Sequence, residues 1–132
     1  MPVTIERLPG EPILLITYSG RVIPTELDLA APQIEEAIAD LEPPIFRISN
    51  TLPADVSFTE MVRLLPKVTM EHSAISTRDR RFIDIAVVGD NLIANLAANS
   101  LGQDQYGAAR LTIFDNLDDA LAHARAGLPG DQ

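Results

Sequence analysis

The sequence predicts one α/β domain over residues 1–132, with a five-strand mixed sheet and the element order β-β-α-β-α-β-α-β-α. Near the N-terminus, two short apolar runs flank the turn Pro9-Gly10-Glu11-Pro12, which is typical of an antiparallel hairpin. Beyond the hairpin, apolar runs of strand length alternate with runs that repeat at the helical period, which favours parallel strands joined by helices. We therefore expect a sheet that is antiparallel at its hairpin and parallel elsewhere, with helices packed mainly on one face.

Five segments carry strand patterns. The first alternates apolar and polar residues, as a half-buried strand does, and the second is rich in β-branched residues. The fourth, FIDIAVV, is almost continuously apolar, which predicts a central strand covered on both faces. The predicted strands are Val3–Leu8, Ile13–Tyr18, Ile45–Ser49, Phe82–Val88 and Leu111–Phe114.

The first two predicted helices follow the second and third strands. In Thr25–Leu41, Thr25 is the expected N-cap, and Pro32 is expected to kink or restart the helix because it lacks an N–H and crowds the preceding turn. The second helix opens at Ser57, which has the spacing of a capping box with Glu60.

Two further helices are predicted after the fourth and fifth strands. Asp90 or Asn91 is the expected cap of the first, and Asp115 or Asn116 the expected cap of the second. Gly127 is expected to end the last helix.

Charge and composition exclude several classes of protein. With 19 acidic against 10 basic residues, the net charge is −9, which disfavours nucleic acid and anionic membranes as partners because polyanions are repelled. The chain has no cysteine, which removes disulfides, thiolate catalysis and cysteine-based metal sites. We find no signal-peptide pattern and no apolar stretch near the roughly 20 residues that span a bilayer. We therefore expect a cytoplasmic protein without membrane insertion.

No catalytic or cofactor motif is visible. The phosphate-binding patterns GxGxxG and GxxxxGK[ST] are missing. His72 and His123 are far apart in the sequence and have no nucleophile or metal ligand near them; His123 is best interpreted as a solvated residue near a helix C-terminus. We predict no cofactor, no metal and no enzymatic activity, although a fold alone does not exclude an enzyme.

Four segments resemble one protein family. They are ILLITYSGRV at the second strand, ADVSFTEMVRLL after the third, VVGDN after the fourth, and IFDNLDDALAHAR near the end. With these segments and the element order, the chain resembles the STAS-like (SpoIIAA-like) domains related to bacterial anti-sigma-factor antagonists. The resemblance implies a five-strand mixed sheet with four or five helices, no intrinsic catalysis, and protein–protein interaction switched by phosphorylation.

The resemblance also implies a candidate phosphorylation site. In well-studied members of the family, a serine follows an aspartate at the start of the helix after the third strand, in a D-S-x-G-like pattern. The matching stretch here is Asp55-Val56-Ser57-Phe58, in which the aspartate is displaced by one position and no glycine follows the serine. Ser57 is therefore either a phosphorylated switch at a helix N-terminus or only the cap of that helix.

Other residues are candidates for a ligand or partner surface. Asp55 and Thr59 lie beside the candidate serine. Gly89, Asp90 and Asn91 form a turn after a buried strand, and ligands of open α/β sheets gather at such strand ends. The alternative for this turn is an ordinary strand-to-helix connection with a glycine in a special backbone conformation.

Two further features each have two interpretations. Tyr106, in a glycine-flanked loop, either contributes to a ligand or partner surface or packs the loop onto the sheet. Asp84, inside the most apolar strand, is either a functional carboxylate or is paired with Arg80, Arg81 or solvent. The arginines at 78, 80 and 81 are most simply a solvated loop, or a bridge to an acidic patch on a second copy.

The sequence favours a non-enzymatic protein-interaction module whose partner is unknown. Its 46% hydrophobic content leaves room for an exposed docking patch or a homodimer. The alternative is a domain that binds a small apolar or amphipathic, lipid-like ligand between the sheet and its helices.

Overall fold

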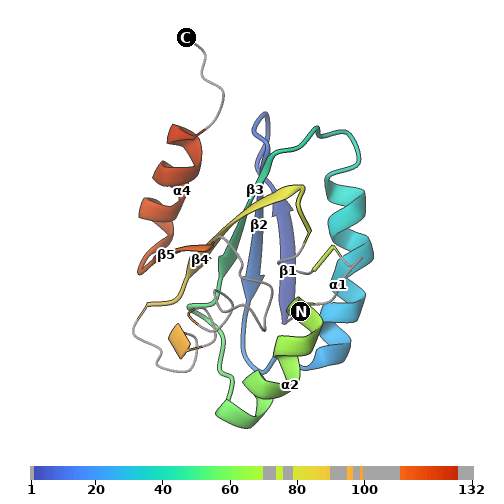
Figure 1. Ribbon diagram of the computed structural model, residues 1–132, viewed down its shortest axis with the longest axis vertical. Coiled ribbons are helices and arrows are strands. Elements are labelled where there is room, and N and C mark those ends of the chain that lie inside the picture. The colour runs from blue at the N-terminus through green and yellow to red at the C-terminus, as the bar shows by residue number, and fades with distance from the viewer. Residues whose placement is uncertain are drawn as a thin grey trace.

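The computed structural model (Figure 1) has the predicted order of strands. The residues that the structure describes are 2–69, 74–75, 79–89, 95–96, 99 and 111–127. The strands are β1 (Val3–Arg7), β2 (Ile13–Tyr18), β3 (Ile45–Asn50), β4 (Phe82–Val87) and β5 (Leu111–Phe114). The helices with described bounds are α1 (Pro24–Ala37), α2 (Phe58–Val68) and α4 (Leu117–Ala126).

The strands form one sheet in which their spatial order is their order in the chain, β1-β2-β3-β4-β5. β1 and β2 pair antiparallel, and each later strand runs parallel to the one before it. The short turn between β1 and β2 permits only an antiparallel pair, whereas the longer connections that carry α1 and α2 return the chain for parallel pairing. The predicted mixed sheet with an N-terminal hairpin is confirmed. β1 ends one residue earlier than predicted and β3 one residue later.

The start and end of α1 differ from the prediction. The helix begins at Pro24, with Ile23 in the N-cap position and no side-chain hydrogen bond there, so Thr25 is not the cap. Proline suits the first helical position because its missing N–H would have no partner in that turn. The helix runs through Pro32 without restarting, and it ends at Ala37 rather than at residue 41.

The predicted caps of α2 and α4 are confirmed. Ser57 accepts a hydrogen bond from the Glu60 N–H, and the Glu60 carboxylate accepts one from the Ser57 N–H, which completes the capping box. At α4, the Asn116 side chain accepts from the Asp119 N–H at 2.8 Å. Gly127 takes the C-cap position of α4, as predicted.

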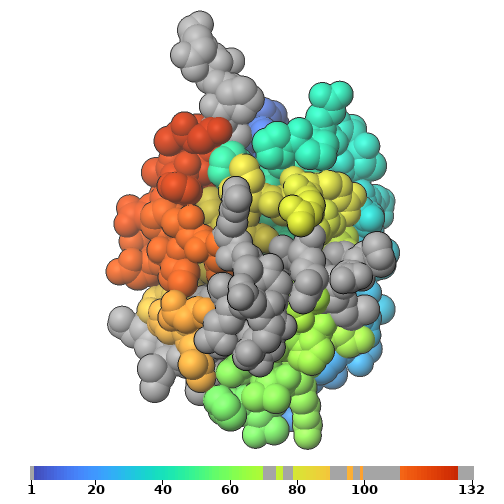
Figure 2. All heavy atoms as spheres, in the orientation of Figure 1, coloured from blue at the N-terminus to red at the C-terminus, as the bar shows by residue number. Residues whose placement is uncertain are grey.

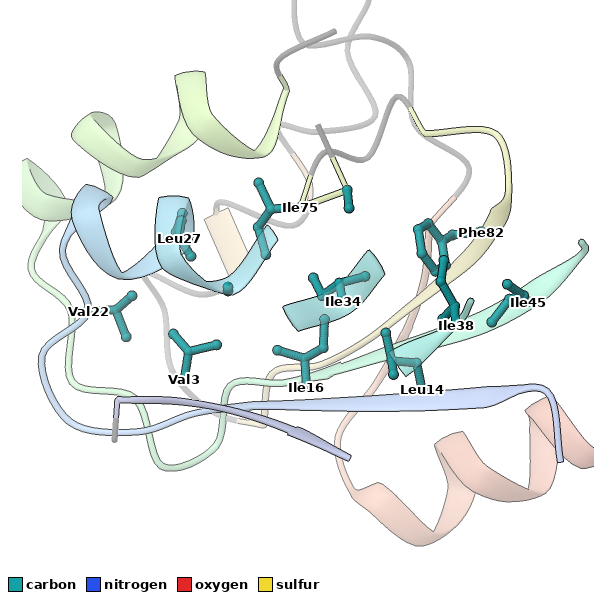
Figure 3. Packing of buried hydrophobic residues seen from close by; sticks show 12 residues of the cluster. Val3, Leu14, Ile16, Val22, Leu27, Ile34, Ile38, Ile45, Ile75 and Phe82 are labelled. Atoms are coloured by element: carbon teal, nitrogen blue, oxygen red, sulfur yellow. The ribbon is translucent and has the colours of Figure 1, made fainter. Parts of the chain in front are cut away.

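Apolar side chains cover both faces of the sheet. On one face, α1 packs against β1 and α2 packs on α1, and Leu14 and Ile16 of β2 belong to the same apolar cluster as Leu27 and Ile34 of α1 (Figure 3). On the other face, α4 lies against β3, β4 and β5. Two of the described helices thus share a face, as predicted, and α4 covers the opposite one. The buried residues of the α4 face are Ile13, Leu15, Phe46, Ile48, Ile85, Val87, Ala120 and Ala124.

Candidate functional site

The loops that follow β2 and β3 are joined at the carboxyl edge of the parallel strands. The Gly20 N–H donates to the Pro53 carbonyl at 2.9 Å, and the Asp55 N–H donates to the Gly20 carbonyl at 2.8 Å. These bonds form a parallel bridge between Gly20 and Ala54, and Gly20 has a φ of 61° there. Glycine adopts this positive φ without the steric cost that a side chain would add. The two loops therefore form one backbone unit at the N-terminal end of α2.

The loop after β3 is also held by the end of β4. The Thr51 N–H and Oγ1 both donate to the Val87 carbonyl, at 2.9 and 2.7 Å. Two residues after the end of β4, Gly89 has a φ of 52°, and a Cβ there would lie 2.6 Å from Leu52 Cδ2. The positive φ is what favours glycine at position 89, because the exposed Leu52 side chain could move away from a Cβ. This turn brings Gly89 beside the loop that leads to Ser57.

Ser57 sits within a network of hydrogen bonds at the start of α2. The Glu60 N–H donates to Ser57 Oγ at 3.2 Å, and the Ser57 N–H donates to Glu60 Oε1 at 3.1 Å. Arg21, from the loop after β2, donates through Nε to Glu60 Oε2 at 2.5 Å. The hydrogen bond from the Ser57 backbone and the bond from Arg21 lower the pKa of the Glu60 carboxyl below its usual value. The helix-cap interpretation of Ser57 therefore explains its observed contacts.

Exposed apolar side chains surround this helix start. Phe58 is 55% exposed and Val62 is 48% exposed, and at i and i+4 they share one face of α2. Thr59 and Arg63 are exposed on the same helix. We call these four residues the α2 patch. In Figure 2, α2 (green) forms the lower part of the surface.

Leu52 and Asp55 extend the exposed surface beyond the helix. Leu52, in the loop after β3, is 46% exposed, and Asp55 is also exposed. Asp55, Ser57, Thr59 and Gly89 thus lie in the segments that follow β3 and β4 at the carboxyl edge of the sheet. Their role in a ligand or partner surface stays a prediction. Asp90, Asn91 and Tyr106, the other candidates for this surface, lie outside the described residues, as do His72 and Arg78.

The predicted partners of Asp84 are wrong. Asp84 is 6% exposed and pairs with Arg47 of the neighbouring strand, at 2.6 Å from Arg47 Nε to Asp84 Oδ1 and 3.1 Å from Nη2 to Oδ2. Arg81 instead binds Asp79, with its Nη2 2.6 Å from Oδ2, and Glu35. Register explains the difference, because β3 and β4 place residues 47 and 84 directly opposite each other.

Arg47 has no role among the predictions from the sequence, although the pattern of its strand indicates a buried ion pair. It lies in IFRIS, where both faces of the strand carry apolar residues, and the parallel strand that follows carries one carboxylate among apolar residues. A lone cation and a lone anion in two buried strands predict an ion pair, because an unpaired buried charge is costly.

The remaining candidates have simpler contacts. Arg80 is exposed, as expected of a solvated loop. His123 is exposed near the end of α4, as expected, and its ring centroid lies 5.2 Å from that of Phe114.

Over the described part of the chain, no three side chains of His, Cys, Asp or Glu gather in a way that could hold a metal ion. Every buried side-chain nitrogen and oxygen there has a hydrogen-bond partner. None of the helices in these ranges is both long enough and apolar enough to cross a bilayer.

Comparisons with known proteins identify the fold. No family model matches the sequence, and no curated protein matches it significantly. An uncharacterised protein of the DUF3478 family with a SpoIIAA-like fold, from Shewanella loihica PV-4, aligns with a TM-score of 0.59 and 18% identity, over 92% of this chain and 91% of its own. An anti-sigma factor antagonist from Mycobacterium paratuberculosis aligns with a TM-score of 0.52 and 16% identity, over 93% of this chain and 92% of its own. The chain therefore has a SpoIIAA-like, or STAS-like, fold.

Proposed function

We propose that this chain is a non-enzymatic regulatory module that binds a partner protein through the α2 patch. The observation that carries the proposal is the exposure of Phe58 and Val62 on one helix face beside the joined loops. Apolar side chains that gather on a surface and are rimmed by polar groups are typical of interaction sites. The anti-sigma factor antagonist with the same fold supports a protein as the partner.

The packing of α2 does not require Phe58 or Val62. The helix buries Met61 and Leu65 on its inner side, and it packs on α1. Full burial of a side chain such as Phe or Val is worth about 1.5–3 kcal/mol relative to exposure. Phe58 and Val62 are 55% and 48% exposed, so part of this stabilisation is left unused in the isolated chain, and a partner that covers the α2 patch would supply it.

Regulation through Ser57 is the second part of the proposal. The serine is exposed, and it lies between the patch and the joined loops. A phosphate on Ser57 Oγ would bring about −1.5 to −2 charge against the Glu60 carboxylate. Glu60 would then be repelled from the capping box, and Arg21, now paired with Glu60, would be attracted to the phosphate. The charge and shape of the surface at the start of α2 would change together.

Protein retention from the native host tests the docking surface. Immobilised wild-type chain is compared with the double variant Phe58→Ser/Val62→Ser, and the retained proteins are quantified by mass spectrometry. We expect a protein retained by the wild type to fall at least about tenfold with the double variant, because one or two buried apolar side chains account for more than 1.4 kcal/mol of binding. Leu29→Ser is the matched control, because Leu29 is 57% exposed on α1 and lies outside the patch.

Three outcomes would count against the proposal. Equal retention by the double variant and the wild type would remove the α2 patch as the docking surface. Recovery of a bound small molecule in place of a protein would favour the lipid-like ligand alternative. A stable homodimer in light scattering that is lost in the double variant would make a second copy the occupant of the patch. The cytoplasmic location and the absence of nucleic-acid binding stay predictions.

A further inference from the structure

One buried ion pair has a contact that reaches beyond the sheet. Among the described residues, Arg47 and Asp84 are the buried charged side chains, at 2% and 6% exposure. Two guanidinium nitrogens of Arg47 bind the two carboxylate oxygens of Asp84, and the guanidinium lies 4.1 Å from the centroid of the Phe82 ring. This geometry fixes the plane of the guanidinium, because a bidentate pair has only one orientation.

The third guanidinium nitrogen is directed at the chain that leaves α2. Arg47 Nη1 donates to the Ala74 carbonyl at 2.6 Å. Ala74 and Ile75 are 4% and 5% exposed, and Ile75 lies in the same apolar cluster as Leu27 of α1 (Figure 3). A residue of the sheet is thus bound to the backbone six residues after the end of α2 at Val68.

An ion pair near the end of α2 is a weaker directional anchor. α2 packs on α1, and Lys67 of α2 pairs with Asp28 of α1 at 2.9 Å, with side chains that are 30% and 53% exposed. A solvent-exposed ion pair of this kind contributes about 0–1 kcal/mol. The buried, charge-assisted bond from Arg47 to Ala74 is therefore a stronger directional contact than this ion pair, and it holds Ala74 against the sheet.

Stability alone does not account for this pair. A buried ion pair can often be replaced by apolar residues of similar volume without loss of stability, because desolvation offsets the attraction of the charges. Apolar side chains cannot, however, donate to the Ala74 carbonyl. We propose that Arg47, oriented by Asp84, is a positioning residue that fixes the exit of α2 and thereby the orientation of the α2 patch. This inference rests on the proposed function of that patch.

Hydrogen exchange of the isolated chain tests the proposal. The variant Arg47→Met/Asp84→Leu removes both charges, so that neither is left buried alone. We expect it to unfold in one cooperative transition, with amide exchange about tenfold faster in residues 58–69 and unchanged in α4. The matched control is Arg125→Met/Glu11→Leu, which removes an exposed bidentate pair that joins α4 to the β1–β2 turn and should leave α2 unchanged.

The result that would overturn the proposal is equal acceleration in α2 and α4, or no acceleration in α2. If the double variant does not fold, Arg47→Lys replaces it, because an ammonium can neutralise Asp84 without holding both the carboxylate and Ala74 in the same plane. If the amides of α2 in the Arg47→Lys variant exchange at the wild-type rate, the positioning role is rejected. The measurement uses the chain alone, so its result does not depend on whether a partner binds the α2 patch.

Discussion

Helices α2 and α4 have similar N-terminal caps, but their apolar side chains lie in different surroundings. Each starts at a polar side chain that accepts a hydrogen bond from the N3 N–H, Ser57 in α2 and Asn116 in α4. α4 places alanines against three strands, and Ala120 and Ala124 are fully buried. α2 packs on another helix and leaves Phe58 and Val62 outward. Apolar spacing therefore predicts a helix, but it does not say which apolar side chains the fold itself buries.

The sizes of the side chains explain why the two helices differ. Small residues allow α4 to approach the sheet closely, and a Cβ on its C-cap Gly127 would lie 2.7 Å from Phe46 Cζ. No comparable constraint acts on the outward face of α2, where large apolar residues remain in solvent. Two such side chains on one helix face are better explained by an interaction than by stability, whereas a single exposed apolar residue such as Leu29 needs no such explanation.

The largest effect on folding is expected on the α4 side of this comparison. Ala124→Leu inserts three carbon atoms where the side chain has no exposed surface, and overpacking of this kind costs about 1–3 kcal/mol. Phe58→Ser, on the exposed face of α2, should change the free energy of unfolding by no more than about 0.5 kcal/mol. Urea denaturation measures both. A large decrease in the free energy of unfolding with Phe58→Ser would mean that Phe58 is part of the folded core. The contrast between the two helices would then disappear.

A smaller effect is expected at the two caps, where the helices should behave alike. Ser57→Ala and Asn116→Ala each remove an acceptor for an N3 N–H, and each should cost about 1 kcal/mol of unfolding free energy. Ser57→Asp should keep most of that stability, because aspartate is also a good N-cap. If Ser57→Ala leaves the free energy of unfolding unchanged while Asn116→Ala lowers it by the expected amount, Ser57 does not stabilise α2 as a cap. That result would favour the interpretation of Ser57 as a switch.

The parts of the molecule that sequence could predict are the local ones. The capping box needs only the spacing of Ser57 and Glu60, and the strands need only short apolar runs. The ion pair of Arg47 and Asp84 joins residues 37 positions apart, and it depends on the register of β3 against β4. Arg21 reaches Glu60 across 39 positions, because two loops are joined by backbone hydrogen bonds. No local pattern contains such pairings, so the sequence indicates Ser57, Glu60 and their neighbours in the chain but neither Arg21 nor Arg47.

The smallest effect concerns the charge on Glu60, whose carboxylate accepts hydrogen bonds from both Ser57 and Arg21. Hydrogen bonds from Ser57 and Arg21 hold the pKa of Glu60 below its ordinary value of 4.5 in the folded chain. A carboxyl whose pKa is lowered by folding contributes stability above its unfolded pKa and loses it as the pH falls through the folded pKa. The difference in unfolding free energy between wild type and Glu60→Gln should therefore be present at about pH 7 and shrink toward about pH 3.

Urea titrations of the two proteins at a series of pH values measure this difference directly, and the other carboxylates cancel because both proteins carry them. Arg21→Gln is the matched control, since it keeps the Ser57 bonds and removes only the second partner of Glu60. The pH dependence of the unfolding free energy of Arg21→Gln should lie between those of the wild type and Glu60→Gln. A difference that stays constant with pH would show that the charge on Glu60 does not contribute to the stability of the folded chain. In that case Glu60 and Arg21 would not form a charged pair that a phosphate on Ser57 could disrupt, and the electrostatic part of the proposed switch would fail.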